Sequence, residues 1–466
     1  MPLHLKKNKQ LMNSRKILFW SVTVAMGGFL FGFDTAVISG TEQSIQAVWQ
    51  LDVFQHGLTV SIALIGTVIG ALFGGYPSDR IGRKNTLFWI GVLYLMSAAG
   101  SALAPDWYSF LFFRFIGGLG VGASSVAAPM YISEIAPAKD RGKMVAMFQF
   151  NVVFGILVAF LSNYLLKDIG SNAWRWMLGV EACPAAVFVG LVLLVPESPR
   201  WLIVKRGAVE EARVVLNQIN PSTANAELSA IIASKDKDER RSTRDSLFSR
   251  QHSFPVMLAV AFAVFNQVSG INAIIYYAPR IFEMTGLGKD ASLLSSAGIG
   301  LVNLIFTLVG LNLIDRVGRR TLMLVGSFGL IITLSLVSWA FYTESFNGIL
   351  VPLCLFGYIA FFAFSQGAVI WVFISEIFPN SVRASGQALG SFTHWFMAAV
   401  IAFVFPYIAT TLGGGNTFLI FAGMMVLQLL FVWKIMPETK GISLEDIGEK
   451  VESQDAIEKV SLTKTL

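Results

Sequence analysis

The hexapeptide DRIGRK occupies residues 79–84, and its near copy DRVGRR occupies residues 315–320. The two copies start 236 residues apart, and each follows a long apolar stretch. Three further pairs recur in the same order at offsets of 238, 242 and 241 residues: GFDTAVIS (32–39) with GINAIIYY (270–277), SEIAPAKDR (133–141) with SEIFPNSVR (375–383), and PESPR (196–200) with PETKG (437–441). Four repeated pairs in one order indicate that the chain consists of two related halves.

The composition indicates a membrane protein. Of the 466 residues, 55% are hydrophobic and only 14% are charged, whereas about a quarter of the residues of a soluble domain carry a charge. This balance excludes a soluble enzyme, a disordered chain and a disulfide-rich secreted domain. Both cysteines, Cys183 and Cys354, lie in apolar stretches, and we expect them to be buried hydrophobic residues rather than a disulfide.

Twelve stretches are long and apolar enough to cross a bilayer, for which a helix needs about 20 residues. Helices are favoured because the apolar runs are continuous, whereas the strands of a membrane β-barrel alternate over about 10 residues. The sequence therefore predicts an all-α membrane protein of two pseudo-symmetric six-helix halves. The predicted spans are 17–40, 57–77, 86–104, 110–132, 143–165, 177–195, 253–276, 291–314, 321–341, 349–374, 385–410 and 416–436.

The basic residues predict which side of the membrane each loop faces, because Lys and Arg accumulate in cytoplasmic loops. With both termini in the cytoplasm, 30 of the 35 basic residues lie inside; the others are Lys167, Arg175, Arg280 and Lys289 in outer loops and Arg114 in a span. The net charge of +6 is then a sign of topology and does not indicate nucleic-acid binding. No N-x-S/T acceptor occurs, which favours a bacterial inner membrane over a glycosylated surface.

Four domains are predicted. They are an N-terminal six-helix half at 1–195, a cytoplasmic linker at 196–252, a C-terminal six-helix half at 253–436 and a cytoplasmic tail at 437–466. The linker differs sharply in composition, since it carries 10 basic and 8 acidic residues in 57. Its segment 207–219 places apolar residues at helical spacing, which predicts short surface helices there.

Paired six-helix halves are typical of transporters that rock one half against the other around a central site. The repeated cytoplasmic loops carry both signs of charge at helix ends, and ion pairs there could close the inner side. The alternative is that these charges are solvated caps, since a surface ion pair contributes only about 0–1 kcal/mol. The candidate gate residues are Asp79, Arg80, Arg83, Glu134, Arg141, Glu197, Arg200, Asp315, Arg319, Glu376 and Arg383.

Over essentially its whole length, the sequence resembles the sugar porters of the major facilitator superfamily. The loop motif DRIGRK alone would indicate only the superfamily, whereas PESPR, PETKG and QVSGIN (267–272) together are specific to the sugar porters. Other matching segments are FGFDTAVISG (31–40), RFIGGLGVG (114–122) and PMYISEIAP (129–137). The resemblance implies the major facilitator fold and a transporter without a cofactor or a metal.

Three ionisable side chains, Asp34, Arg114 and Glu181, lie within predicted spans, where charge is costly and marks function by default. The resemblance implies that Asp34 and Arg114 are partners. Burial favours the protonated acid and a neighbouring guanidinium favours the carboxylate, so separating the pair would let Asp34 take up a proton. The resemblance associates an Asp here with proton coupling; the alternative is a static ion pair. We expect Glu181 to relay or modulate protonation.

A sugar site needs side chains that both donate and accept hydrogen bonds, together with aromatic faces. The resemblance implies four sugar-contacting amides, Gln149, Gln267, Asn272 and Asn303, and four aromatic residues, Phe31, Tyr276, Trp371 and Trp395. Asn272 and Tyr276 are four residues apart and would share a helical face. The alternative for each amide is a hydrogen bond that only joins two spans.

Three positions depart from the family's pattern. Asn266 stands where a second Gln often occurs, His394 stands where an amide would precede Trp395, and the segment 365–373 lacks the prolines common before Trp371. His394 could still form a hydrogen bond to a sugar hydroxyl, so it remains a candidate.

The sequence thus predicts a monomeric secondary active transporter that imports a hexose or pentose with a proton by alternating access. Its expected partners are the monosaccharide, the proton and the lipid bilayer. The nearest alternative is a sugar or polyol facilitator without proton coupling. A non-transporting sugar sensor would carry a longer tail than the roughly 30 residues expected here. An enzyme is disfavoured because no nucleophile, base and orienting group occur together, and the four histidines lack metal-ligand spacing.

Overall fold

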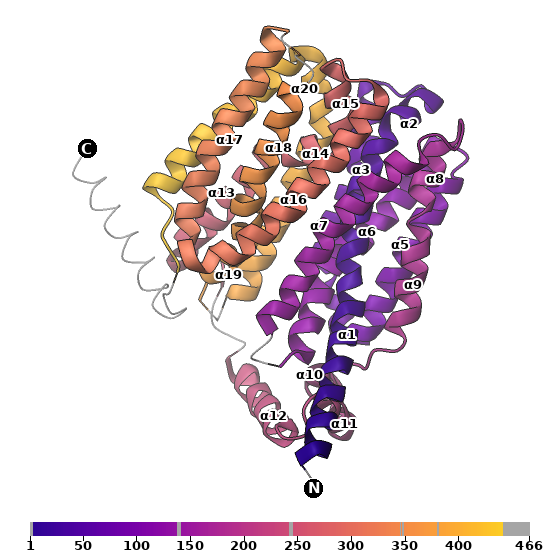
Figure 1. Ribbon diagram of the computed structural model, residues 1–466. Helices are drawn as coiled ribbons and strands as arrows, with labels where there is room; N and C mark the ends of the chain where they lie inside the picture. The colour runs from indigo at the N-terminus through magenta and orange to yellow at the C-terminus, as the bar shows by residue number, and fades with distance from the viewer. Residues whose placement is uncertain are drawn as a thin grey trace, which may run out of the picture. The chain divides into compact units, whose positions relative to one another are not determined.

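The structure of the protein is a computed structural model. It describes residues 3–137, 141–241, 246–344, 346, 349–379 and 382–440, and the side chains of all of these except 3–14 and 235–241. Every regular element in the described part of the chain is a helix (Figure 1). The predicted all-α fold is therefore confirmed.

The first half of the sequence forms nine α-helices and one short 3-10 turn. They are α1 (Leu3–Val37), η1 (Ile38–Gly40), α2 (Glu42–Trp49), α3 (Val53–Phe73), α4 (Gly75–Ile81), α5 (Arg83–Leu103), α6 (Trp107–Ile135), α7 (Arg141–Leu166), α8 (Ala173–Gly179) and α9 (Ala182–Val192). The linker forms α10 (Pro199–Trp201), η2 (Leu202–Arg206), α11 (Val209–Ile219), α12 (Ala224–Arg241) and η3 (Arg250–His252).

The second half repeats this arrangement of long helices with short interruptions. Its elements are α13 (Ser253–Val268), α14 (Ile271–Tyr276), α15 (Ala278–Met284), α16 (Lys289–Val317), α17 (Arg319–Tyr342), α18 (Leu350–Phe362), η4 (Ala363–Gly367), α19 (Ala368–Glu376) and α20 (Arg383–Lys434).

Among the described residues, eleven helical segments are long and apolar enough to cross a membrane. The last of them, α20, is 52 residues long and contains the non-helical residue Gly413. Gly413 lies between the last two predicted spans, 385–410 and 416–436, so α20 is two spans joined at a kink. The twelve predicted spans therefore all fall on helices, and the membrane fold agrees with the prediction.

Two spans of the second half depart from a regular α-helix. The seventh span breaks at Gly270, between α13 and α14. The tenth span contains a π-helical turn, η4, directly before α19. This span lacks the prolines that the family's pattern would place there, yet its helix departs from α geometry at this turn. Single π-turns in α-helices are frequent at functional sites.

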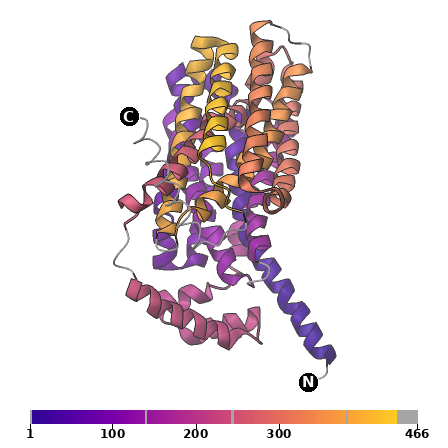
Figure 2. The same cartoon turned by 90° about the vertical axis from the view of Figure 1, so that its left-hand side faces the viewer.

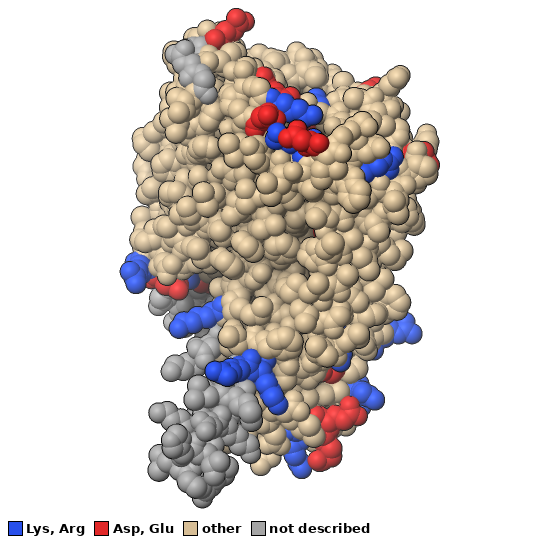
Figure 3. All heavy atoms as spheres, turned by 45° about the vertical axis from the view of Figure 1, so that its right-hand side comes forward, with Lys and Arg blue, Asp and Glu red and all other residues tan. Residues whose placement is uncertain are grey.

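Many large apolar side chains are exposed, as expected of helices that face lipid. Trp89, Phe112, Phe328 and Trp339 are each more than half exposed. On the face shown in Figure 3, charged side chains gather toward two opposite ends, and the surface between them is largely free of charge. Lipid, unlike water, makes such a surface favourable.

The two cysteines differ from the expectation that both are buried. Cys354 is buried, whereas Cys183 is exposed. Cys183 lies at the start of α9, within the sixth span, so its side chain points away from the helix packing. An apolar stretch therefore did not imply burial within the protein, because a membrane helix also has a lipid-facing side.

The described contacts divide the chain into two compact units. The first comprises Met1–Val37, Ile65–Ala159 and Leu166–Arg244, and the second comprises Ile38–Leu64, Phe160–Leu165 and Asp245–Leu466. This division follows packing rather than the sequence repeat, so the predicted domain boundaries stay a prediction.

The linker contains the predicted surface helices. In α11, Ala212, Val215 and Leu216 are buried on one face, as their spacing predicts. Figures 1 and 2 show α11 and α12 at the end of the first unit where α1 begins. This placement agrees with a linker and an N-terminus on the same side of the membrane.

Equivalent glycines mark the two copies of the repeated loop. Gly82 precedes α5 with φ +96°, and Gly318 precedes α17 with φ +100°. A Cβ atom at Gly82 would lie 2.2 Å from Glu197 Oε2, and one at Gly318 would lie 2.6 Å from Glu438 Oε2. Both the backbone conformation and the neighbouring carboxylate therefore require glycine.

We predict that Gly82→Ala and Gly318→Ala each destabilise the protein by about 1–3 kcal/mol, because alanine is strained at this φ and its Cβ displaces the carboxylate. Thermal unfolding in detergent measures the effect. Gly75→Ala is the control, since no atom lies within 4 Å of the added Cβ. Equal melting temperatures for Gly82→Ala and Gly75→Ala would contradict the prediction.

Candidate functional site

A buried ion pair joins α1 to α6 in the first unit. Arg114 Nη1 donates to Asp34 Oδ1 at 2.5 Å, and Arg114 Nη2 donates to the backbone oxygen of Asp34 at 3.2 Å. Both side chains are buried. The structure thus brings together the two residues that the family resemblance implied to be partners.

Glu181 is the third charged group of this region. It is buried at the start of α9, and it interacts electrostatically with both Asp34 and Arg114. Its Oε1 atom has no hydrogen-bond partner among the described residues. Two carboxyl groups thus share one guanidinium away from water, so the group of three is neutral only when one carboxyl carries a proton.

Sequence reasoning missed the hydroxyl groups around this pair. Tyr94 of α5 is buried and interacts electrostatically with Asp34 and Glu181. A Cβ atom at Gly117 would lie 2.3 Å from Ser97 Oγ and 3.4 Å from Asp34 Oδ1, so α5 and α6 pack closely beside the carboxylate. The available signal was the spacing of Tyr94 and Ser97, which places two hydroxyls one turn apart in an apolar span.

Two predicted sugar-contacting residues also belong to the first unit. Phe31 lies three residues before Asp34 on α1, and Gln149 lies on α7. Both side chains are half-buried. Phe31 is therefore on the same helix as the ion pair, about one turn away.

The amides of the second unit form a connected cluster. Gln267 Nε2 donates to Asn266 Oδ1 at 2.9 Å, and Asn272 Nδ2 donates to Gln267 Oε1 at 2.5 Å. Gln267 Nε2 also lies 3.2 Å from His394 Nδ1. We refer to Asn266, Gln267, Asn272 and His394 as the amide cluster. The break at Gly270 is what allows Asn272 of α14 to turn back toward Gln267 of α13.

Aromatic rings extend the amide cluster. The His394 ring lies 4.9 Å from the Trp371 ring and 4.8 Å from the Trp395 ring, measured between centroids. Trp395 is buried, whereas Trp371 is 37% exposed. His394 departs from the family's pattern, yet it joins the amides to both tryptophans. A cluster of amide donors, amide acceptors and ring faces can bind a polyhydroxylated ligand.

The remaining predicted contacts lie nearby in sequence or on another helix. Tyr276 is buried in α14, four residues after Asn272 in the same helix. Asn303 is buried on α16, where its Oδ1 accepts from Thr307 Oγ1 at 3.4 Å. In the described part of the chain, no hydrogen bond links Asn303 to the amide cluster.

The repeated loop of the first unit forms a network around Arg83. Its Nε and Nη2 donate to the two carboxylate oxygens of Glu134 at 3.0 Å each, and its Nη1 donates to Asp79 Oδ1 at 3.0 Å. The Glu197 carboxylate accepts from the backbone N–H groups of Arg83 and Lys84 at 2.9 and 3.2 Å. A negative charge there stabilises the N-terminus of α5.

The second unit repeats this network around Arg319. Arg319 donates to the Glu376 carboxylate at 3.2 and 2.8 Å and pairs with Asp315 at 3.0 Å. The Glu438 carboxylate accepts from the backbone N–H groups of Arg319 and Arg320 at 2.9 and 3.0 Å. Glu438 was not among the predicted gate residues, although its motif PETKG pairs with PESPR, which contains Glu197.

The linker contacts the network around Arg83 through Asp79. Lys205 Nζ lies 2.8 Å from Asp79 Oδ2, and Trp201 Nε1 donates to the backbone oxygen of Asp79 at 2.8 Å. Partial burial acts to raise the pKa of the Asp79 carboxyl, but Lys205 and Arg83 outweigh it and lower that pKa. Burial raises the pKa of the Glu197 carboxyl, although three backbone N–H groups favour its charged form.

Four predicted gate residues lie outside these ion pairs. Arg80 is exposed and donates to Tyr76 Oη at 3.1 Å. Arg141 and Arg200 are exposed, and Arg141 pairs with no acidic residue that the structure describes. Arg383 Nε donates to the backbone oxygen of Phe378 at 3.2 Å. The ion pairs around Arg83 and Arg319 each stay within one unit, so their opening and closing role stays a prediction.

A comparison with known families matches residues 20–451 to the model of sugar (and other) transporters. The arabinose-proton symporter of Bacillus subtilis (strain 168) is 36% identical over 455 residues, which cover 96% of this chain and 98% of the relative. The D-xylose-proton symporter of Escherichia coli (strain K12) is 36% identical over 474 residues, which cover 93% of this chain and 96% of the relative.

Solved structures of the xylose transporter XylE from E. coli are also similar. Its partially occluded inward open conformation matches with a TM-score of 0.82 at 35% identity, covering 92% of this chain and 100% of that one. Its structure with 6-bromo-6-deoxy-D-glucose matches with a TM-score of 0.77 at 35% identity, covering 93% of this chain and 99% of that one. Both the sequence and the fold are therefore shared over nearly the full length.

We predict that Arg83→Lys destabilises the protein by about 1–3 kcal/mol, because lysine cannot donate to both Glu134 oxygens while also reaching Asp79. Arg80→Lys is the matched control: it stands on the same loop, but Arg80 is exposed and should change stability little. Thermal unfolding of both variants in detergent tests the difference. If both melt alike, the Arg83 network contributes no more than a surface charge.

Proposed function

The chain belongs to the sugar (and other) transporter family, and we propose that it imports a monosaccharide together with a proton by alternating access. It is a membrane transporter and not an enzyme. The proposal rests chiefly on one observation, the buried contact of Asp34 with Arg114 beside the unpartnered oxygen of Glu181. The names of the two symporters to which the chain is similar support the same function.

Proton coupling follows from the charges of this group. While Arg114 touches Asp34, the carboxylate is stabilised as an ion. A movement that withdraws Arg114 leaves a buried carboxylate without a cation, and taking up a proton is then the cheapest way to neutralise it. Glu181, within electrostatic range of both, is the group that passes or retains this proton. A facilitator needs no such titratable group, so the pair favours symport.

The amide cluster is the proposed sugar-binding surface of the second unit. Its amides are linked by two hydrogen bonds, while Asn266 Nδ2 has no partner among the described residues. A sugar hydroxyl could replace these bonds or meet this donor because it both donates and accepts. The partly exposed face of Trp371 suits the C–H surface of a pyranose or furanose ring. Phe31, Gln149, Tyr276 and Asn303 are further candidate contacts. We propose a hexose or a pentose as the substrate class.

The proposed location is the inner membrane of a bacterium, with both termini in the cytoplasm. The excess of Lys and Arg in the loops of that side supports this orientation. One chain contains both sequence halves, so a monomer is sufficient for transport. The networks around Arg83 and Arg319 are the proposed cytoplasmic gate elements.

We predict that Asp34→Asn abolishes sugar-driven alkalinisation of the medium but retains exchange of labelled sugar across the membrane, because asparagine hydrogen-bonds without titrating. Reconstituted vesicles with an external pH electrode measure the first, and counterflow measures the second. Asp168→Asn, at an exposed acid in a predicted outer loop, is the control and should behave as the unaltered protein. If the Asp34→Asn variant still alkalinises the medium when sugar is added, another residue must couple sugar to proton transport.

We predict that Gln267→Ala weakens sugar binding by about 10–100-fold, equivalent to about 1–3 kcal/mol for lost hydrogen bonds. Gln428→Ala is the matched control: Gln428 is an equally buried amide that donates to Ser327 Oγ at 2.7 Å, away from the amide cluster. Titration with D-xylose, L-arabinose and D-glucose measures affinity, and thermal unfolding corrects for stability. Equal losses of affinity in both variants would remove Gln267 from the site.

A further inference from the structure

A buried polar group that the proposed function leaves unused lies in the second unit, at the predicted outer side. Glu42, the first residue of α2, is 0% exposed. Arg280 of α15 donates to both of its carboxylate oxygens, with Nε 2.9 Å from Oε1 and Nη2 2.7 Å from Oε2. Such a forked pair is among the strongest hydrogen-bonded contacts in proteins.

His56 is the second partner of Glu42. Its ring is 1% exposed, and its Nε2 lies 2.8 Å from Glu42 Oε2. Neither ring nitrogen has a hydrogen-bond partner among the described residues. A protonated ring would leave a charged N–H donor buried and unpaired. In this geometry Arg280 supplies the positive charge that faces both oxygens of Glu42.

Among the residues that the structure describes, no cation contacts His56. The ring packs against Tyr277, with 5.9 Å between ring centroids, and Tyr277 donates its hydroxyl to the backbone oxygen of Ala402 on α20. The sequence of α20 has no Lys, Arg, Asp or Glu between its terminal residues Arg383 and Lys434.

The carboxyl groups of two further acidic residues of the second unit, Asp52 and Glu283, are not described as contacting the His56 ring. The carboxylate of Asp52 accepts from the backbone N–H of Gln55 at 2.8 Å. Glu283 lines a pocket together with Arg280. Arg280 and His56 are thus the described ionisable groups that contact Glu42, and Arg280 carries the charge that balances it.

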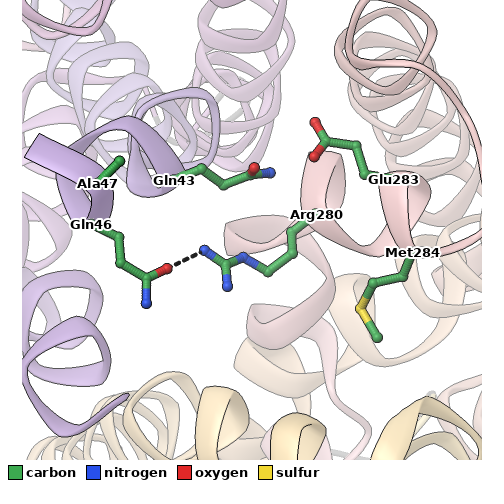
Figure 4. Close-up of a pocket in the computed structure, with 6 residues that line it drawn as sticks. All are labelled: Gln43, Gln46, Ala47, Arg280, Glu283 and Met284. Carbon is green, nitrogen blue, oxygen red and sulfur yellow. Dashed lines mark hydrogen bonds between the residues drawn. The ribbon is translucent and has the colours of Figure 1, made fainter. Parts of the chain in front are cut away.

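Arg280 is the member of the group that water reaches. It is 29% exposed and borders a pocket of about 520 Å³. Figure 4 shows it extending from α15 toward Gln46 of α2, whose Oε1 accepts from Arg280 Nη2 at 2.7 Å. The pocket is lined by Gln43, Gln46, Ala47, Arg280, Glu283 and Met284. Glu42 and His56 lie buried behind this arginine.

We propose that Glu42, His56 and Arg280 form an outer latch that exchanges Arg280 for a proton when the outer side opens. This inference rests on alternating access, which is part of the proposed function. Glu42 and His56 belong to the first sequence half and Arg280 to the second, so movement of one half against the other separates the arginine from its two partners.

Opening leaves the Glu42 carboxylate with His56 alone. A proton on His56 restores the neutrality that Arg280 supplied, and the opened side gives Nδ1–H access to water. Opening is therefore linked to the uptake of one proton from outside, and acid favours the open outer side. The ratio of open to closed molecules is expected to rise by up to about tenfold for each pH unit of acidification, in the range where histidine changes its charge.

The test measures the separation of the outer ends directly. Spin labels at Val48→Cys and Met284→Cys, at side chains that are 52% and 41% exposed, report the distance between α2 and α15 by pulsed dipolar spectroscopy. The exposed Cys183 is first replaced by Ser. In lipid nanodiscs, a longer-distance population should grow as the pH is lowered from about 8 to about 5.5.

Two variants identify the groups responsible. His56→Gln keeps a polar side chain beside Glu42 but cannot gain a charge, so its open fraction should not respond to pH. Glu42→Gln removes the charge that Arg280 holds, so the longer distance should dominate at every pH. The control is His252→Gln, at a histidine that is equally buried but lies in η3 before α13, and it should respond as the unaltered protein does.

A pH response in His56→Gln equal to that of the unaltered protein overturns the latch, and so does a single distance at every pH in the unaltered protein. These results are separable from a failure of symport. If sugar moves no protons but the distances respond to pH through His56, the latch stands and the proposed function is wrong. If sugar moves protons but the distances do not respond to pH, the proposed function stands and the latch is wrong.

Discussion

The structure depends on one constraint: a charge held away from water needs a partner of opposite sign. Arg114 meets it for Asp34 in the first unit, and Arg280 meets it for Glu42 in the second. A static protein satisfies the constraint once. A protein that moves its helices must satisfy it in each state, so every separation of such a pair has to be compensated by a proton or by a new partner. Proton coupling is in this sense a consequence of burial.

The sequence repeat is reproduced at the level of single hydrogen bonds. Glu197 and Glu438 accept from the first backbone N–H groups of α5 and α17, where the helix dipole favours a negative charge. Each carboxylate occupies the space that a side chain at Gly82 or Gly318 would fill. These glycines and glutamates lie more than a hundred residues apart in the sequence, yet each pair forms one structural unit in both halves.

The spans could be predicted because continuous apolar runs of this length have few alternatives to a membrane helix. The pairing of Asp34 with Arg114 came from the family resemblance, and the spacing of the residues alone could not have supplied it. The π-turn before α19 was missed because it has no proline or glycine signal at its start. The Glu42 and Arg280 contact was missed because its members are 238 residues apart and each resembles an ordinary loop charge. Patterns of neighbouring residues in the sequence therefore predict helices well, but they do not predict which distant residues contact each other.

The linker makes the two repeats unequal. Lys205 and Trp201 bind the loop that carries Asp79, whereas Asp315, its counterpart, pairs only with Arg319 among the described residues. The two copies of the loop share the same hydrogen-bond geometry, but only the first has described contacts with Lys205 and Trp201 of the linker. A movement of Lys205 or Trp201 therefore breaks a contact with the first loop, whereas no linker residue is described as pairing with Asp315. The two related halves of the protein therefore respond differently to a movement of the linker, although their loops have nearly the same sequence.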